Sequence, residues 1–416
     1  MDRKVARDKW FLAYLPVNSA NGLVSPLAPL FITEILLGGV VEYSLFTIVA
    51  SISTIVGLFL WGYLSDKLKK RKIFVILGFI SLGITSILFG LSPNVLFFLG
   101  VSFLSGFFGS AAAPIASVLI MELSDRKDWS NKISKFSLYA SLGQIIGVLL
   151  AAGLSIIFFQ SSSLRLLYYI ASVLYFISGI AAWLLIPEPK NTIDRNKVDI
   201  RSFRVFEKIR YFPSHVIHWN FKFTNFDKNL RITLISFMIM MMGFQLYFVA
   251  FPILLKEIGV NNTVFFLIYL GNYIFAAITF TFSGQIATKV GYKKVTSLAV
   301  ITRLIIFPST TLLIILLHSN KALLFDSLLL VYSILGALWS FISVGTATLS
   351  SNLSKPEQRG VVAGTYNAVQ SIGVIVGSSL TGLIVLKYGF SVDFLMADLV
   401  VLIGLLSFIR VNDKSN

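Results

Sequence analysis

The stretch GYLSDKLKKRK, residues 62–72, places one carboxylate and five basic residues between two long apolar runs. Charge this dense cannot lie in hydrocarbon, so the stretch is expected to form a short loop at a membrane surface. A similar stretch, GQIATKVGYKK, returns 222 positions later at residues 284–294, again between apolar runs. The sequence therefore indicates an internal repeat, with the same arrangement of apolar runs and basic loops in each half.

The composition indicates an integral membrane protein. Of the 416 residues 56% are hydrophobic and only 13% are charged, and the mean hydropathy is +0.83. Such a chain is too apolar for a soluble protein of this length. It contains no cysteine, which excludes disulfides and thiolate metal sites. His215 and His218 have helical spacing but no third ligand nearby, so no metal or cofactor is expected.

The apolar runs predict twelve spanning helices, because about 20 helical residues cross the roughly 30 Å hydrocarbon core. The expected spans are about 10–37, 43–65, 73–92, 95–121, 133–158, 165–186, 230–256, 262–287, 295–317, 323–349, 361–386 and 391–410. Six of them precede a long polar interruption and six follow it.

Lys and Arg are concentrated in alternate loops. Thirty of the 35 lie at the termini, in the middle segment and in every second loop, whereas the opposite face has only four. This distribution predicts that both termini and the middle segment are cytoplasmic. The net charge of +16 is therefore a topology signal, and no nucleic-acid partner is expected.

The polar interruption divides the chain into residues 1–186, a linker at 187–229, and residues 230–416. Two prolines at its start are expected to end the sixth helix. Within the linker, residues 199–212 have apolar positions on one stripe and basic residues elsewhere, which predicts an amphipathic helix on the membrane surface. A tether between two rigid halves is the simpler interpretation of this segment, and a binding role is the alternative.

The two halves share further landmarks. Pro29 and Glu34 in the first span match Pro252 and Glu257 in the seventh at an offset of 223. A second set consists of glycines expected at helix contacts, Gly143 and Gly147 in the fifth span and Gly373 and Gly377 in the eleventh. Parallel repeats of six helices place a substrate cavity between them near the middle of the bilayer.

These features resemble the major facilitator superfamily of secondary transporters. The family signature of the loop between spans two and three, Gly-x-Leu-Ala-Asp-Arg-x-Gly-Arg-Lys, appears here as Gly62, Leu64, Ser65, Asp66, Lys67, Lys69, Lys70 and Arg71. Lys69 replaces the inner glycine, and the second copy has Thr288 in place of the carboxylate. The string PEQRG at residues 356–360 is similar to the family's stretch between spans ten and eleven.

The resemblance implies two pseudo-symmetric bundles of six helices and a latch that holds the cytoplasmic side closed. In that latch Gly62 would allow close helix approach, and Asp66 would face the N-terminus of the eleventh helix. The expected latch residues are Gly62, Asp66, Lys70, Arg71, Gly284, Gly291 and Arg359. The alternative is that the basic cluster only anchors the topology.

Two charged residues lie inside the expected hydrocarbon, Arg303 in the ninth span and Asp398 in the twelfth. Their depths are roughly 14 and 18 Å by helical rise, which is close enough to pair. Both helices are peripheral scaffold in the resembled fold, so a structural ion pair is expected. An anion-binding Arg303 and a snorkelling Arg303 are the alternatives. Glu34 and Glu257, at the outer ends of their helices, are expected to be simply solvated, and a role as a proton carrier is the alternative for either.

Uncharged polar residues in the spans are candidates for the substrate cavity. They are Asn18, Asn21, Gln144, Gln245, Asn272, Tyr273, Trp339, Asn367 and Gln370. Each of the amides could instead bridge two helices.

The expected function is secondary transport of a small organic solute across the cell membrane by alternating access. An efflux pump for hydrophobic compounds is the alternative, and a receptor or intramembrane enzyme on the same scaffold is a third possibility for which no catalytic constellation is present. The family's proton-linked motifs are degraded, with Phe103 near an expected arginine and no proline after Gly147. A proton or another coupling ion stays open as a partner beside the solute and the bilayer. A monomeric protein is expected, and the lack of cysteine together with the abundance of Ile, Leu and Lys favours a thermophilic prokaryote as its source.

Overall fold

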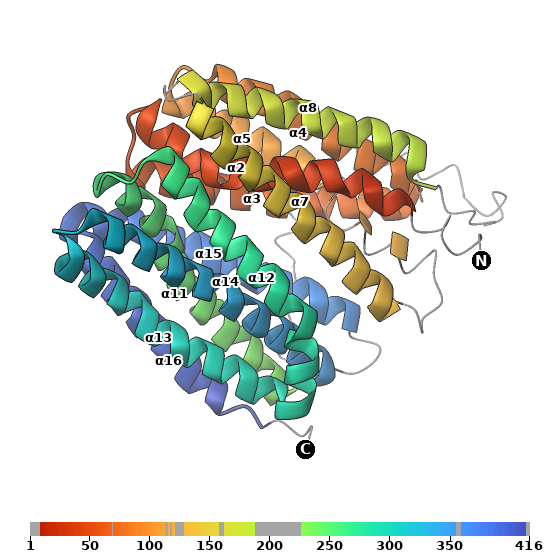
Figure 1. The fold of residues 1–416 in the computed structure, drawn as a ribbon. Helices are drawn as coiled ribbons and strands as arrows, with labels where there is room; N and C mark the ends of the chain where they lie inside the picture. Colours follow the sequence, from red (N-terminus) through yellow and green to blue (C-terminus); the bar gives the residue numbers. More distant parts are fainter. Residues whose placement is uncertain are drawn as a thin grey trace.

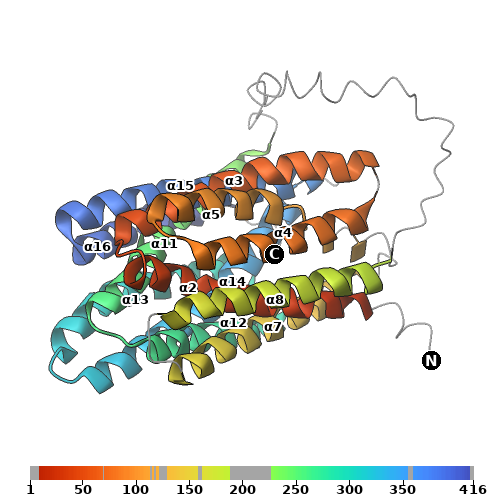
Figure 2. The same ribbon diagram turned by 90° about the horizontal axis from the view of Figure 1, so that it is seen from above.

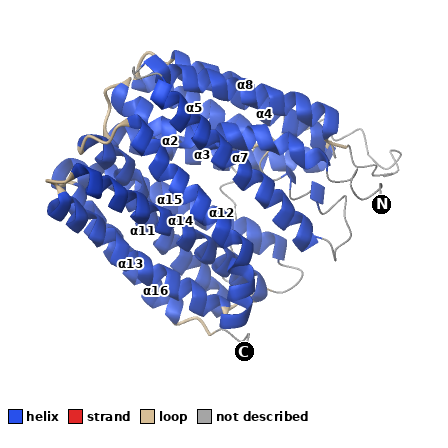
Figure 3. Cartoon of the chain, viewed as in Figure 1, coloured by secondary structure: helices blue, strands red, loops and turns tan. Residues whose placement is uncertain are grey.

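The computed structural model describes residues 9–68, 70–112, 115–116, 119–120, 129–157, 162–187, 226–354 and 359–412, and these residues form helices without strands (Figure 3). Twelve α-helices and one short 3-10 helix fall within the described residues. They are η1 (Lys9–Ala13), α2 (Tyr14–Glu34), α3 (Val40–Leu68), α4 (Arg71–Leu91), α5 (Val95–Gly109), α7 (Trp129–Ile157), α8 (Ser162–Leu185), α11 (Lys228–Glu257), α12 (Asn262–Val290), α13 (Tyr292–Leu317), α14 (Lys321–Asn352), α15 (Arg359–Tyr388) and α16 (Phe390–Ile409). The predicted all-α membrane fold with twelve helices is confirmed.

Ten of these helices are long and apolar enough to cross a membrane. Helix α2 is less apolar, since it carries two asparagines and three prolines, and it is the most deeply buried helix of its half. Helix α5 ends at Gly109, earlier than the predicted residue 121, and the Oγ of Ser110 donates a hydrogen bond to the carbonyl of Phe107 at this end. Part of the remaining segment lies outside the described residues.

Polar caps begin several helices at the end of the molecule that the sequence predicts to be extracytoplasmic, hereafter the outer end. The side-chain oxygens of Asn94, Asn261 and Asn320 accept backbone N–H bonds at the starts of α5, α12 and α14. Such caps satisfy backbone donors that the helix itself leaves free. At the opposite, inner end, α12 stops at Gly291, whose φ of 102° suits glycine.

The helices form two groups of six, α2–α8 and α11–α16, which Figure 1 shows in red to yellow and in green to blue. The two groups repeat the same contacts. Helix α2 packs on α7 in the first group as α11 packs on α15 in the second. The four repeated glycines lie in these contacts. A Cβ at Gly143 would lie 2.7 Å from the Cβ of Asn18, and one at Gly373 would lie 2.6 Å from the carbonyl oxygen of Met238.

The most extensive contacts between the groups are those of α3 with α15 and of α7 with α12 (Figure 2), and smaller contacts join α2 to α11 and α12 and α3 to α11. Elsewhere many large apolar side chains face outward. Ile315 on α13 is 68% exposed and Leu386 on α15 is 74% exposed. In a soluble protein this would be an aggregation hazard, but it is what a lipid-facing surface requires.

The predicted amphipathic helix at 199–212 and most of the linker lie outside the described residues, as do His215 and His218. The division at residues 186 and 230 agrees with the two groups of helices but stays a prediction, and so does the cytoplasmic position of the termini.

Candidate functional site

The second bundle contains a cavity of about 280 Å³ between five of its helices. Its lining residues are Met241, Phe244, Gln245 and Phe248 on α11, Asn272 on α12, Arg303 on α13, Leu335, Gly336 and Trp339 on α14, and Gln370 and Val374 on α15. Four of the nine residues that the sequence proposes for a substrate cavity, on four different helices, therefore line one space. They are Gln245, Asn272, Trp339 and Gln370.

The amides of this cavity retain hydrogen-bonding capacity. The Nδ2 of Asn272 donates to the carbonyl oxygen of Tyr332 at 2.8 Å, which ties α12 to α14. The side chains of Gln245 and Gln370 form no hydrogen bond within the described part of the chain. A buried or half-buried amide without a partner is costly, so these two groups are suited to a polar ligand or to water.

Arg303 lies against this cavity with its side chain only 1% exposed. Its Nη2 donates to the carbonyl oxygen of Leu335 at 3.1 Å. Its guanidinium carbon is 4.3 Å from the ring centre of Phe244 and 5.3 Å from that of Phe248. The Nε and Nη1 of the same group have no hydrogen-bond partner among the described residues.

The predicted ion pair between Arg303 and Asp398 is wrong. No contact joins the two side chains, and the Oδ1 of Asp398 has no hydrogen-bond partner within the described residues. Similar depth along two helices does not determine which way each side chain points around its helix axis. Arg303 points toward α11 and α14, so α13 contributes to the cavity and is not purely peripheral.

The polar candidates in the first bundle have other surroundings. The hydroxyl of Tyr175 donates to the Oδ1 of Asn21 at 2.7 Å, so Asn21 bridges α2 and α8. The Nδ2 of Asn18 donates to the carbonyl of Tyr14 in its own helix. Gln144 and Tyr273 are half-buried, Asn367 is exposed, and none of these three lines the cavity described above.

A polar cluster joins the two bundles at the outer end. The Nζ of Lys256, in the last turn of α11, lies 2.5 Å from the Oε1 of Glu34, which ends α2. The Nδ2 of Asn262 donates to the other carboxylate oxygen at 3.1 Å, and the same lysine donates to the Oδ1 of Asn262. The sequence led us to expect that Glu34 is simply solvated, and this expectation is wrong. The sequence signal that could have predicted this pair is the opposite charge of Lys256, in the last turn of the equivalent helix α11.

A second contact across the bundles lies nearby, where the Oγ of Ser155 on α7 is 3.0 Å from the Oγ1 of Thr263 on α12. The other main pair of helices between the bundles, α3 and α15, is also close at this end. A Cβ at Gly382 of α15 would lie 3.1 Å from the Oγ of Ser44 on α3. Both contacts belong to the outer end, since Ser155 and Gly382 are near the ends of their helices and Thr263 and Ser44 near the starts of theirs.

The three glycines of the predicted latch at the inner end have open surroundings among the described residues. A Cβ at Gly62, Gly284 or Gly291 would meet no described heavy atom within 4 Å, so the close approach expected at Gly62 is not formed in this conformation. The Nη1 of Arg71 donates to the Oγ of Ser65 at 2.9 Å. Lys70 is exposed at the start of α4. The side chains of Asp66 and Arg359 lie outside the described residues, so the latch stays a prediction.

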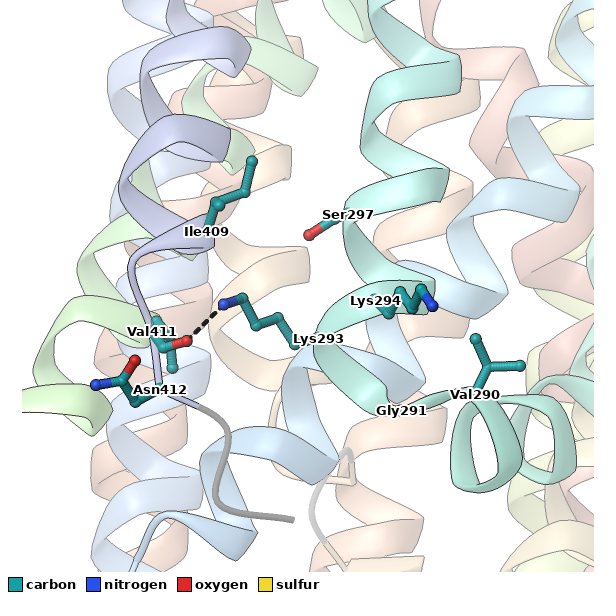
Figure 4. A pocket seen from close by; sticks show the side chains of 8 residues that line it. All are labelled: Val290, Gly291, Lys293, Lys294, Ser297, Ile409, Val411 and Asn412. Carbon is teal, nitrogen blue, oxygen red and sulfur yellow. Dashed lines mark hydrogen bonds between the residues drawn. The ribbon is translucent and has the colours of Figure 1, made fainter. Parts of the chain in front are cut away.

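A larger cavity of about 740 Å³ lies at the inner end of the second bundle (Figure 4). It is formed where α12, α13 and α16 end or begin. The Nζ of Lys293 crosses it to donate to the carbonyl oxygen of Val411 at 2.7 Å, while Lys294 points elsewhere. This lysine ties the start of α13 to the end of α16 and lies away from the cavity around Arg303.

Within the described residues no group of three His, Asp or Glu side chains could hold a metal ion. Two repeated helical bundles, a lipid-facing exterior and a partly polar interior cavity define a membrane transporter. The family model of the Major Facilitator Superfamily matches residues 10–226 and 233–416, and the chain belongs to this family.

Relatives of known sequence and structure agree with this assignment. The chain is 24% identical to Multidrug resistance protein 2 of Bacillus subtilis over 406 residues, covering 95% of this chain and 91% of that protein. A bacterial homologue of the human lysosomal transporter Spinster, in an inward-facing and occupied conformation, has a TM-score of 0.75 with 13% identity over 100% and 98% of the two chains. A D-xylose-proton symporter has a TM-score of 0.71 with 14% identity over 99% and 97%. The protein is a multi-pass membrane transporter.

Proposed function

We propose that this transporter moves a small organic solute by alternating access, and that the present structure is the state closed at the outer end. The observation that carries this proposal is the ion pair between Glu34 of one bundle and Lys256 of the other. The contacts of Ser155 with Thr263 and of Gly382 with Ser44 support it at the same end. The likeness in fold to an inward-facing transporter agrees with it.

The open surroundings of Gly62 and Gly284 at the inner end complete the argument. Two bundles that contact each other at one end, and have no described contact at the latch glycines of the other end, can rock about a central site. The solute would reach the cavity around Gln245 and Gln370 from the inner side, and breaking the outer contacts would expose it to the other side. The latch residues would take over when the inner end closes.

A cysteine cross-link tests this motion, and the natural chain has no cysteine to interfere. The double variant Ser155→Cys with Thr263→Cys places two thiols where the hydroxyls are 3.0 Å apart. Oxidation should then hold the outer end closed. Purified protein would be screened by thermal shift against sugars, amino acids, carboxylates and lipophilic cations, and the compound with the largest shift would be assayed for uptake into proteoliposomes.

We expect uptake by the double variant to stop on oxidation and to return on reduction, whereas each single variant should transport with or without oxidant. Transport that continues through a fully cross-linked outer end would refute alternating access from this state.

Export of hydrophobic compounds is a second candidate. It is favoured by the relative named Multidrug resistance protein 2 and by the aromatic side chains of Phe244, Phe248 and Trp339 around the cavity. The same screen separates the two functions. One polar class that shifts the melting temperature supports a dedicated solute, and shifts with many unrelated lipophiles support an efflux pump.

A further inference from the structure

Arg303 reaches an unexpected place in the second bundle. It belongs to α13, yet its guanidinium lies among side chains of α11 and α14 and borders the 280 Å³ cavity. Its side chain is 1% exposed, so bulk water does not solvate the charge. A guanidinium stays protonated at any physiological pH. This cavity therefore has a permanent positive charge in its wall.

The charge is only partly compensated by the protein. One carbonyl oxygen, that of Leu335, accepts from Nη2 at 3.1 Å, and Nε and Nη1 have no acceptor in the described part of the chain. No carboxylate of the described residues lies within ion-pair distance of Arg303. Removing a charge from water without a counter-charge costs several kcal/mol, so an acceptor group with a negative charge is the partner that this site lacks.

The aromatic rings explain why the charge is tolerated without a ligand. Phe244 at 4.3 Å, Phe248 at 5.3 Å and Trp339 at 5.8 Å present their rings to the guanidinium. Cation–π attraction stabilises the guanidinium, but a ring accepts no strong hydrogen bond and carries no net charge. The rings thus hold Arg303 in position and leave two of its donors unused.

The rest of the lining suggests the shape of the missing group. In an arginine, Nε with Nη2 and Nη1 with Nη2 each form a planar pair of donors that matches the two oxygens of a carboxylate. The carbonyl of Leu335 takes only one of the two Nη2 hydrogens, so one such pair stays available. The free amides of Gln245 and Gln370 can bind further polar atoms, and the aromatic side chains suit an apolar or aromatic body. With one cationic residue in the cavity, a single negative charge balances the site.

We propose that Arg303 is the anion-binding residue of the substrate cavity and that the solute is a small organic monocarboxylate with an apolar or aromatic body. This inference rests on the proposed transport function. It also separates the two candidate functions, because a buried cation repels the lipophilic cations that a multidrug exporter would be tested with.

Binding to the purified full-length protein tests the proposal. The probes are benzoate and 2-naphthoate, each compared with its neutral amide and with benzylammonium as the cation. We expect the two carboxylates to raise the melting temperature of the wild-type protein, and the amides and benzylammonium to have no effect at the same concentration. Equal shifts for acid and amide, or no shift with either carboxylate, would overturn the proposal without the need for any variant.

Two substitutions then connect the effect to the residue. Arg303→Gln should weaken carboxylate binding roughly tenfold or more, because it removes a charge-assisted hydrogen-bonding group. Arg303→Lys should bind at an intermediate level, since it keeps the charge and loses the planar pair of donors.

Arg165→Gln is the matched control. Arg165 also donates to a backbone carbonyl, that of Gly90, and also lies over a phenylalanine ring, that of Phe31, but it is in the first bundle and away from the cavity. Its substitution should leave carboxylate binding at the wild-type level, even if it lowers the melting temperature of the free protein.

Failure of this inference is distinguishable from failure of the proposed function. Suppose that the cysteine cross-link stops uptake of a neutral or cationic compound and that Arg303→Gln does not change the binding of that compound. The proposed transport function is then supported and the proposed anion site is refuted. If carboxylates bind through Arg303 and no compound is transported, the proposed anion site is supported and the proposed transport cycle is refuted.

Discussion

At the scale of single residues, the pair of Lys256 and Glu34 illustrates how a modest interaction can matter in a protein with two states. Its side chains are 17% and 20% exposed, and the ammonium has three oxygen partners in all. A partly exposed ion pair makes a modest contribution to stability, but under the proposed cycle it exists in only one conformation and shifts the balance between conformations by its full free energy.

Loss of this pair should therefore open the outer end. We expect Lys256→Met to cost the outer-closed state about 1–2 kcal/mol, a change of about 5- to 30-fold in the ratio of the two states. The measurement is the rate of maleimide labelling at Ser155→Cys, a site that is 8% exposed in this state.

The exchange of charges in Glu34→Lys with Lys256→Glu is the control, and it should restore slow labelling. Labelling that is equally slow in Lys256→Met would mean that the pair does not hold the bundles together.

The absence of a contact between Arg303 and Asp398 has its own consequence. Because the two side chains are not paired in the described structure, the effects of Arg303→Gln and Asp398→Asn on melting temperature should add. Rescue of one substitution by the other, measured in a double-mutant cycle, would restore the ion pair that the sequence suggested.

At the scale of helices, glycine determines how closely two helices approach in each bundle. Gly147 on α7 faces the backbone of Ser19 on α2, and Gly377 on α15 faces the backbone of Met242 on α11. Backbone cannot move aside as the end of a flexible side chain can. Association of helices in lipid depends on such close packing, since there is no hydrophobic effect between apolar helices in hydrocarbon.

Added methyl groups at these two positions should consequently destabilise the protein. We expect Gly147→Ala and Gly377→Ala each to cost roughly 1–3 kcal/mol through overpacking, seen as a lower melting temperature in detergent. Gly153→Ala is the matched control on α7, because a Cβ there would meet no described atom within 4 Å. An equal loss at all three positions would point to helix flexibility and not to packing.

At the scale of the whole molecule, the distribution of basic residues predicts the orientation in the membrane. Thirty Lys and Arg residues belong to the termini, the linker and every second loop, and four belong to the remaining loops. A fluorescent protein fused at the C-terminus should therefore fold in the cytoplasm and be bright, and alkaline phosphatase fused at the same place should be inactive. Active phosphatase would reverse the orientation and with it the meaning of the outer end.

Much of this architecture follows from the sequence because lipid leaves a chain few choices. Long apolar runs must form helices to satisfy their backbone groups, so twelve helices and most of their ends could be predicted to within a few residues. The repeat of basic loops and glycines at offsets of 222 to 230 positions could also be recognised in the sequence, because it depends only on the order of residues along the chain.

The cavity was only partly predictable. Gln245, Asn272, Trp339 and Gln370 were recognised as polar or aromatic residues in apolar helices, and they line one space. Asn21 met the same criterion and bridges two helices. Composition identifies a residue that needs a polar partner, but it does not say whether that partner is another helix or a ligand.

The spacing of residues along each helix, and the lipid that surrounds it, were thus sufficient to predict the helices, the repeat and the expected orientation from the sequence. The surroundings of Arg303 and the contacts between the bundles, such as the pair of Glu34 with Lys256, depended on which helix faces contact one another. Those directions are set by packing between segments distant in the chain, because a rotation of a helix about its axis changes every neighbour and leaves the hydropathy of the segment unchanged.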